Sequence, residues 1–313
     1  MKILEIKKIN YNGDTYNLHV EDNHNYYANG LLVSNCHRYK SDVAGSIVKE
    51  TLNSKIKLAL TGTLPEDDID KLELLGIFGK PKTYMTSKEL IERGLGTPIK
   101  INSIQLLYND NDRGIFRHLK NYNQQLSFIK EHEKRNALIT NLSCSLLGNT
   151  LVLFQHTDHG KDLFLRIMKK KYPDVEVENK DITGKKSFEF QQKYGVYFLN
   201  GEDDAITRER TRKILEEHSD AILVANFALL STGVSIKRLF HLIFASPLKS
   251  YTTITQSIGR GMRLHPDKKL FNVYDICDKF TPKCIFMKQY EERCRHSYNS
   301  EEFPIVEREF HLN

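Results

Sequence analysis

The chain has 313 residues, of which 40% are hydrophobic and 27% charged, and its formal net charge is +6 at pH 7. It contains no apolar run near the roughly eighteen residues that a membrane helix needs, and its N-terminus lacks a basic-then-apolar signal. Composition therefore excludes a helical membrane protein and a secreted precursor, and it predicts a cytoplasmic protein with a substantial core.

The five cysteines are an odd number spread over a long chain, which argues against a disulfide framework. Cys277, Cys284, Cys294 and His296 match none of the usual zinc spacings, so no metal site is predicted. Residues 1–35 hold three Lys against four acidic residues, so the positive excess belongs to the downstream part. A basic excess fits a nucleic-acid partner without requiring one.

The first segment in chain order ends in Val33-Ser34-Asn35-Cys36. An Asn side-chain amide can attack its own backbone carbonyl and break the peptide bond that follows. A Cys placed directly after it can accept an acyl group through its thiolate. Taken alone, Asn-Cys is equally compatible with an ordinary polar turn.

The run from Thr15 to Asn35 resembles the final motifs of inteins, including the C-terminal halves of split inteins. The resemblance implies a short all-β fragment of the Hint fold that begins inside the intein, needs no cofactor and splices in trans with an N-terminal partner chain. By this resemblance His24 assists cyclisation of Asn35, Ser34 stands in the place of the usual His, and Cys36 is the acceptor nucleophile.

One position departs from the intein pattern. Asn17 stands where the family usually has an Asp that supports acyl transfer, which leaves the splicing rate open. The apolar residues at 16, 18 and 20 alternate as in a strand, and they fit a plain β-hairpin leader as well as an intein.

Downstream of the leader, apolar runs alternate with helical patterns. Residues 55–65 predict a buried strand ended by a Thr-Gly-Thr turn, followed by a helical stretch to about residue 78. An amphipathic helical region follows near 124–147. Further strands are predicted at 150–154, 196–199, 221–225, 241–245 and 270–276, with helices at 159–171, 205–218 and 251–260. This alternation predicts a parallel sheet covered on both faces, with ligands at the carboxyl ends of its strands.

The same patterns predict the domain organisation. Residues 140–280 are long enough for a complete α/β domain, whereas residues 36–100 predict only the tail of another. Residues 101–139 are predicted to be a linker region. Residues 281–313 predict a C-terminal tail that packs as a helix on the second domain, with an extension of a DNA surface as the alternative. The polar stretch 176–194 predicts a hairpin or an insertion.

Three motifs occur in the order and spacing of superfamily-two helicases. Gln256-Ser257-Ile258-Gly259-Arg260-Gly261-Met262-Arg263 resembles their motif VI, residues 230–235 resemble motif V, and residues 60–63 resemble motif III. Residues 231–250 and 79–94 resemble phage UvsW-type recombination helicases in particular. The resemblance implies two RecA-like domains, one partial and one complete, in an ATP-dependent DNA helicase of recombination, repair or replication in a bacterial or phage-infected cell.

The resemblance also implies roles for individual residues. Arg263 would be the arginine finger, Arg260 a second phosphate or interdomain contact, and Gln256 a link to motif II. A transferred phosphoryl group carries charge on several oxygens, which such an arginine stabilises. Further ATP-site residues would be His37, Thr61, Gly62, Thr63, Gly233 and Gly259. DNA contacts would come from Gln155, His156, Thr157 and Thr232. ATP and Mg²⁺ would be the cofactors of the assembled helicase.

Two parts of an ATPase are missing from the sequence. Cys36-His37 lies where motif II belongs, but no Asp-Glu precedes it, and no Gly-rich phosphate loop with Lys-Ser/Thr occurs. Ligation to a partner segment ending in Asp-Glu would assemble motif II. The sequence therefore predicts that the chain alone neither hydrolyses ATP nor unwinds DNA. The alternative is a nucleic-acid-binding or regulatory module whose leader does not splice.

Overall fold

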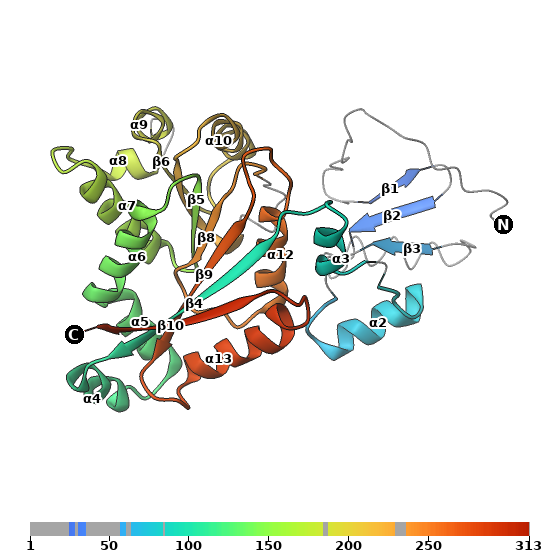
Figure 1. Ribbon diagram of the computed structural model, residues 1–313, viewed down its shortest axis with the longest axis horizontal. Coiled ribbons are helices and arrows are strands. Elements are labelled where there is room, and N and C mark those ends of the chain that lie inside the picture. The colour runs from blue at the N-terminus through green and yellow to red at the C-terminus, as the bar shows by residue number, and fades with distance from the viewer. Residues whose placement is uncertain are drawn as a thin grey trace. The chain divides into compact units, whose positions relative to one another are not determined.

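The computed structural model describes residues 25–28, 31–35, 57–60, 64–83, 85–183, 187–228 and 236–312, the first three ranges as backbone only. The chain divides into two units, residues 1–84 and 85–313, which are described separately (Figure 1). The predictions for His24, Cys36, His37, Thr61, Gly62, Thr63, Thr232 and Gly233 lie outside the described residues.

Unit 1 contains a three-stranded sheet and a helix. Strands β1 (Asn25–Ala28) and β2 (Leu31–Asn35) form an antiparallel hairpin, and β2 pairs in parallel with β3 (Lys57–Leu60). Helix α2 (Asp68–Phe78) follows, within the predicted helical stretch. A hairpin at residues 25–35 fits both the intein resemblance and the plain leader, so it does not decide between them.

Unit 2 is built on a seven-stranded sheet in the order β10-β4-β9-β8-β5-β7-β6, and every neighbouring pair is parallel. Its strands are β4 (Ile99–Tyr108), β5 (Thr150–Phe154), β6 (Val196–Leu199), β7 (Ile222–Asn226), β8 (His241–Phe244), β9 (Phe271–Lys279) and β10 (Ile305–Leu312). The five strands predicted between residues 150 and 276 are all present. The prediction of a parallel α/β sheet is confirmed.

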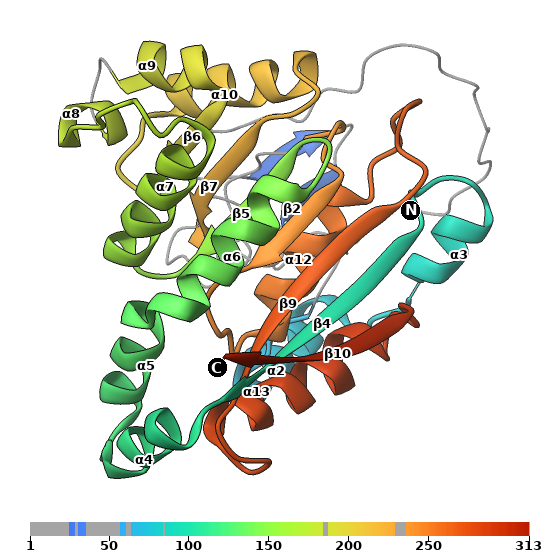
Figure 2. The ribbon, with the colours of Figure 1, turned by 60° about the vertical axis from the view of Figure 1, so that its left-hand side comes forward.

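Helices cover both faces of this sheet. The helices described in unit 2 are α3 (Ser87–Glu92), α4 (Asp110–His118), α5 (Tyr122–Glu131), α6 (Glu133–Ser145), α7 (Thr157–Lys171), α8 (Asn179–Ile182), α9 (Ser187–Tyr194), α10 (Ala205–Glu217), α12 (Tyr251–Gly261) and α13 (Ile285–Arg293), which continues into a π-helical turn, η2 (Cys294–Tyr298). Figure 2 shows α6 and α7 on one side of the sheet and α12 and α13 on the other.

Three segment predictions are corrected by the structure. Residues 101–139, predicted as a linker, contain most of β4, which lies inside the sheet, and helices α4 and α5. The tail 281–313 supplies α13, as expected, but also the edge strand β10. The polar stretch 176–194 forms α8 and α9 instead of a hairpin, because Glu178 and Asp181 form a capping box that starts α8.

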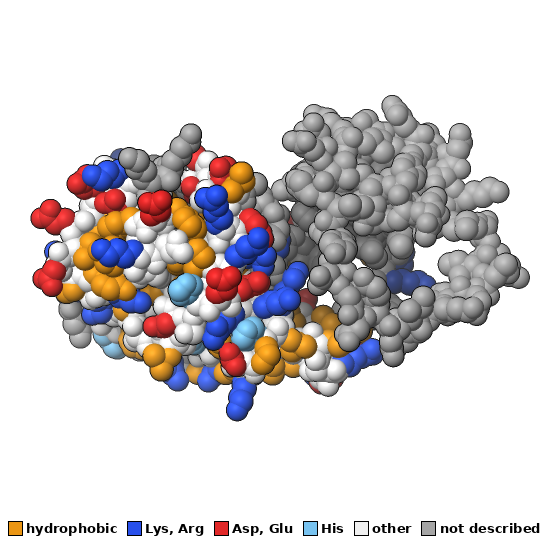
Figure 3. All heavy atoms as spheres, turned by 90° about the horizontal axis from the view of Figure 1, so that it is seen from above, with side chains coloured by type: hydrophobic (Ala, Val, Ile, Leu, Met, Phe, Trp, Pro, Cys, Tyr) orange, Lys and Arg blue, Asp and Glu red, His pale blue; other side chains and the backbone are white. Residues whose placement is uncertain are grey.

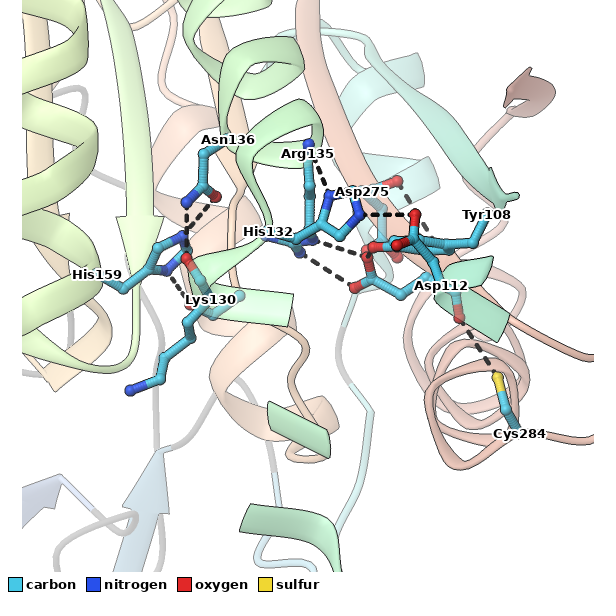
Figure 4. A network of polar contacts seen from close by, with 12 residues as sticks. Tyr108, Asp112, Lys130, His132, Arg135, Asn136, His159, Asp275 and Cys284 are labelled. Atoms are coloured by element: carbon cyan, nitrogen blue, oxygen red, sulfur yellow. Dashed lines mark hydrogen bonds and ion pairs between the residues drawn. The ribbon is translucent and has the colours of Figure 1, made fainter. Parts of the chain in front are cut away.

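Two buried ion pairs fasten helices to opposite faces of β9. Asp275 and Asp278 lie three residues apart on the strand, so their side chains point to opposite faces. Asp275 accepts both Nε and Nη2 of Arg293 on α13 at 2.9 Å. Asp278 accepts Nε of Arg135 on α6 at 2.7 Å and the Tyr108 hydroxyl at 2.7 Å. Figure 4 shows part of this network.

Candidate functional site

Helix α12 carries the segment that resembles motif VI. Ser250 caps its first turn by accepting the Thr253 N–H, and a buried stripe of Ile254, Ser257, Ile258 and Gly261 packs against the sheet. Gly261 permits this close approach, because a Cβ at that position would lie 2.0 Å from the ring of Phe271 on β9. The helix is therefore held at a fixed distance from the strand.

The opposite stripe of α12 is polar. Gln256 and Arg260 are four residues apart and so share a face of the helix. Arg260 is half-buried, and its Nε atom is enclosed without a hydrogen-bond partner among the described residues. Burial lowers the pKa of Arg260, and the positive charge of the exposed Arg263 lowers it further. A desolvated guanidinium with an open donor beside a second cation is suited to bind an anion.

A cavity of about 520 Å³ opens where β5, β7 and β8 end. Its polar lining comes from Gln155, Asn226, Lys249, Ser250, Thr253, Gln256 and Ser257. Asn226 donates its amide to the Gln155 carbonyl at 3.1 Å, which ties the two strand ends together. The cavity thus lies at the carboxyl edge of the sheet, where ligands bind in parallel α/β folds.

The segment predicted to contact DNA, residues 155–157, joins β5 to α7. The Gln155 N–H is bound by Ser246 Oγ at 3.2 Å, and His159 connects Ser246 to Asn136 through contacts of 3.3 and 3.1 Å. Figure 4 shows the His159 ring beside the Asn136 amide. Gln155 and Thr157 are exposed, whereas His156 has a buried Nε2 without a hydrogen-bond partner in the part of unit 2 that the structure describes.

The structure brings only some of the predicted residues together. Gln155 and Gln256, 101 positions apart in sequence, line one cavity. Arg260 lies about 6 Å farther along the axis of α12 than Gln256, at 1.5 Å per residue, and Arg263 follows just after the helix ends at Gly261. Asn226, Lys249, Ser250 and Thr253 were not predicted, although each stands at a strand end or helix start, which is where such a site is expected.

The distribution of surface charge and of possible metal ligands is a further feature of unit 2. Figure 3 shows Lys and Arg side chains interspersed with Asp and Glu on the visible face of unit 2, so no single-sign field dominates there. Among the described residues, no group of three or more His, Cys, Asp or Glu is placed to hold a metal ion. No helix of the described part has the length and apolar character required to cross a membrane. The half-buried Arg260 beside the exposed Arg263 thus suits an anionic ligand.

Comparison with known proteins identifies relatives of the chain. It is 30% identical over 253 residues, 80% of its length, to the ATP-dependent DNA helicase uvsW of Enterobacteria phage T4. The chain spans only 46% of that relative, and less than half of either curated relative that it matches. No established protein-family profile matches the chain.

Solved structures agree with this relation. The T4 UvsW crystal structure matches 91% of the chain at 28% identity with a TM-score of 0.54, and 54% of that structure is covered. Yeast Dbp5 bound to RNA and ADP BeF3 matches 90% of the chain at 11% identity with a TM-score of 0.51, with 60% of Dbp5 covered. The RecA-like helicase fold and the homology of the downstream part to UvsW are confirmed. The Hint-fold leader stays a prediction.

Proposed function

Because the chain is related to superfamily-two helicases, we propose that it supplies motifs III to VI of an ATP-dependent DNA helicase that acts in recombination or repair. One observation carries this proposal: the half-buried Arg260 has an open donor beside Arg263 in a motif VI sequence. An N-terminal partner would bring the phosphate loop and the Asp-Glu of motif II. The chain alone would hold only the arginine side of the ATP site.

In the assembled enzyme the arginines of α12 would act on the phosphates. ATP with Mg²⁺, when bound, would supply the phosphoryl group whose transfer drives movement along DNA. Arg263 would neutralise the charge that develops on the phosphoryl oxygens, a contribution worth on the order of 10³–10⁵ in rate in known NTPases. Arg260 would hold the phosphates through its open donor, and Gln256 would connect α12 to motif II.

DNA would lie along the carboxyl edge of the sheet, near the cavity lined by Gln155 and Lys249. Gln155, His156, Thr157 and Thr232 are the proposed contacts. Their amide, imidazole and hydroxyl groups suit the phosphate backbone and do not distinguish bases, so binding would be independent of sequence. The ammonium of Lys249 at the same cavity would make binding weaker as salt increases.

The leader would join this chain to its partner by splicing. The partner's thioester would pass its acyl group to the Cys36 thiol. Asn35 Nδ2 would then attack its own carbonyl, break the 35–36 bond and leave a succinimide, and an S-to-N shift would form the peptide bond. Strand β2, which ends at Asn35, pairs in parallel with β3, so the partner segment ligated to Cys36 would have to replace β2 beside β3.

Intact mass spectrometry after mixing the chain with a candidate partner under reducing conditions tests the splicing step. The candidate must contain a phosphate loop and end in Asp-Glu before an intein half. We expect a ligated product holding residues 36–313 and a free 35-residue peptide, neither of which forms with Asn35→Ala or Cys36→Ala. Unchanged masses with a folded partner would instead favour the alternative, a non-splicing nucleic-acid-binding module, for which Asn17 is the supporting feature.

Steady-state ATP hydrolysis by the joined product tests the helicase part. Arg263→Ala should lower kcat by about 10³ or more, because the transition state loses its counter-charge. Lys269→Ala, an exposed cation near α12, is the matched control and should leave kcat unchanged. A joined product that binds ATP but shows equal turnover in both variants would refute the role of Arg263.

A further inference from the structure

The end of α12 is bound from outside the helix by two residues far away in the sequence. The last turn of a helix leaves carbonyls without intrahelical partners. Here Lys268 Nζ donates to the Gly261 carbonyl at 2.8 Å. The Thr97 N–H donates to the Met262 carbonyl at 2.7 Å, and Thr97 Oγ1 donates to the Arg263 carbonyl at 3.1 Å. Three consecutive carbonyls around the motif VI arginines are therefore satisfied by Thr97 and Lys268.

Lys268 is an unusual residue in this position because its side chain is buried. Only 5% of the residue is exposed, and its ammonium has no ion-pair partner among the described carboxylates. Its second hydrogen bond, at 2.8 Å, goes to the carbonyl of Lys237, just after the segment that resembles motif V. Burial lowers the pKa of Lys268 to about 8. Burying an ammonium group is unfavourable unless it is hydrogen-bonded. The carbonyls of Lys237 and Gly261 supply these bonds and so hold Lys268 between the segments that resemble motifs V and VI.

Thr97 connects the same turn to another part of the chain. It is fully buried and lies in the connection between α3 and β4, within unit 2. The neighbouring Gly96 approaches the same turn, since a Cβ there would lie 3.4 Å from Met262 Cε. A shift of this connection would therefore act directly on the backbone that carries Arg263.

We infer that Thr97 and Lys268 are positioning residues that hold the arginine-bearing end of α12, coupling Arg260 and Arg263 to the α3–β4 connection and to the segment after motif V. The inference rests on the proposed function for the reaction that the arginines serve. It adds that the placement of the arginines depends on two buried residues that lie outside motifs III, V and VI. A shift of the α3–β4 connection would thereby change the position of the arginines.

The hydrogen bonds from Thr97 and Lys268 to the carbonyls of residues 261–263 are here called the clamp. Hydrogen exchange of the unspliced chain tests the clamp without any ATPase assay. In Lys268→Met and in Thr97→Val, the amides of residue 97 and of the last turn of α12 should exchange about tenfold faster, because each variant removes at least one hydrogen bond. Thr97→Ser keeps the hydroxyl and should restore protection, and the exposed Lys269→Met is the control. Unchanged exchange in folded Thr97→Val would overturn the clamp, and this milder variant decides if Lys268→Met does not fold.

Turnover by the joined protein tests the positioning role. Thr97→Val should lower kcat by about tenfold or more while the KM for ATP stays within about twofold, since misplaced catalytic groups affect the transition state most. Thr97→Ser and Lys269→Met should turn over at the wild-type rate. Faster exchange with unchanged kcat would reject the positioning role. If the wild-type joined protein lacks ATPase activity, the proposed function is wrong, and so is the positioning role. The hydrogen-exchange result would still show whether the clamp exists.

Discussion

His159 shows how a single buried residue supports the segment proposed to contact DNA. Asn136 Oδ1 can only accept, so the Nε2 of His159 carries the proton, and the Nδ1 accepts from the Ser246 hydroxyl. The same Ser246 oxygen accepts the N–H of Gln155. The neutral ring therefore orients the end of β5. Burial, followed by the charge of Arg135, lowers the pKa of His159 to about 3.

This pKa makes a prediction about stability. Between the ordinary value of 6.5 and about 3, the unfolded chain binds a proton at His159 that the folded chain does not. Stability contributed by the neutral ring is therefore complete above pH 6.5 and decreases as the pH falls, by up to about 1.4 kcal/mol per pH unit. His159→Gln should lack this component in urea unfolding at pH 7, 6 and 5, whereas the exposed His118→Gln should keep it. Parallel curves for wild type and His159→Gln would contradict the prediction.

The sequence identified the residues within the motifs but not the residues that contact them. Gln256, Arg260 and Arg263 were found because their spacing resembles motif VI. Thr97 and Lys268 belong to no recognised motif. They contact the end of α12 because they precede β4 and β9, which are neighbours in the sheet. Asn226 and Lys249 join the cavity for the same reason, through the pairing of β5 with β7 and β8.

Helix α12 is positioned by a close contact with strand β9. Gly261→Ala should destabilise unit 2 by about 1–3 kcal/mol, because a Cβ would collide with the fully buried Phe271 ring and force a shift. Gly259→Ala is the matched control in the same helix, since nothing lies within 4 Å of a Cβ there. It should be neutral or stabilising, as Ala favours helix over Gly by up to about 1 kcal/mol. Equal unfolding midpoints for the two variants would show that α12 is free to move away from β9.

Strands were predictable from sequence when they are uniformly apolar. The five residues of β5 are all buried and read as a continuous apolar run, as expected for a central parallel strand. By contrast, β4 buries Ser103 and Gln105, which bond to Cys277 and Lys279, so its pattern does not read as apolar. Strand β10 carries charged residues because it lies at the edge of the sheet, where most of its side chains are exposed to solvent.

At the scale of the whole molecule, unit 2 has its own sheet, core and both helix layers. Residues 85–313 expressed alone should therefore unfold cooperatively in urea, at the midpoint that the full chain shows for this unit, as followed by circular dichroism. Residues 85–303, which lack β10 but keep α13 and η2, serve as the comparison and should lose stability, because β4 would have no partner on one side. A non-cooperative transition for residues 85–313 would mean that unit 2 depends on unit 1.

The position of β4 also sets an order of events during synthesis. Its two neighbours, β9 and β10, are made after it, and β10 follows roughly 200 residues later. At about 5–20 residues per second, a ribosome needs about 10–40 s to cover that distance. Meanwhile β4 waits without either partner, whereas the 35-residue leader has long since emerged. If the leader splices, it can meet its partner while the sheet against which α12 packs is still incomplete.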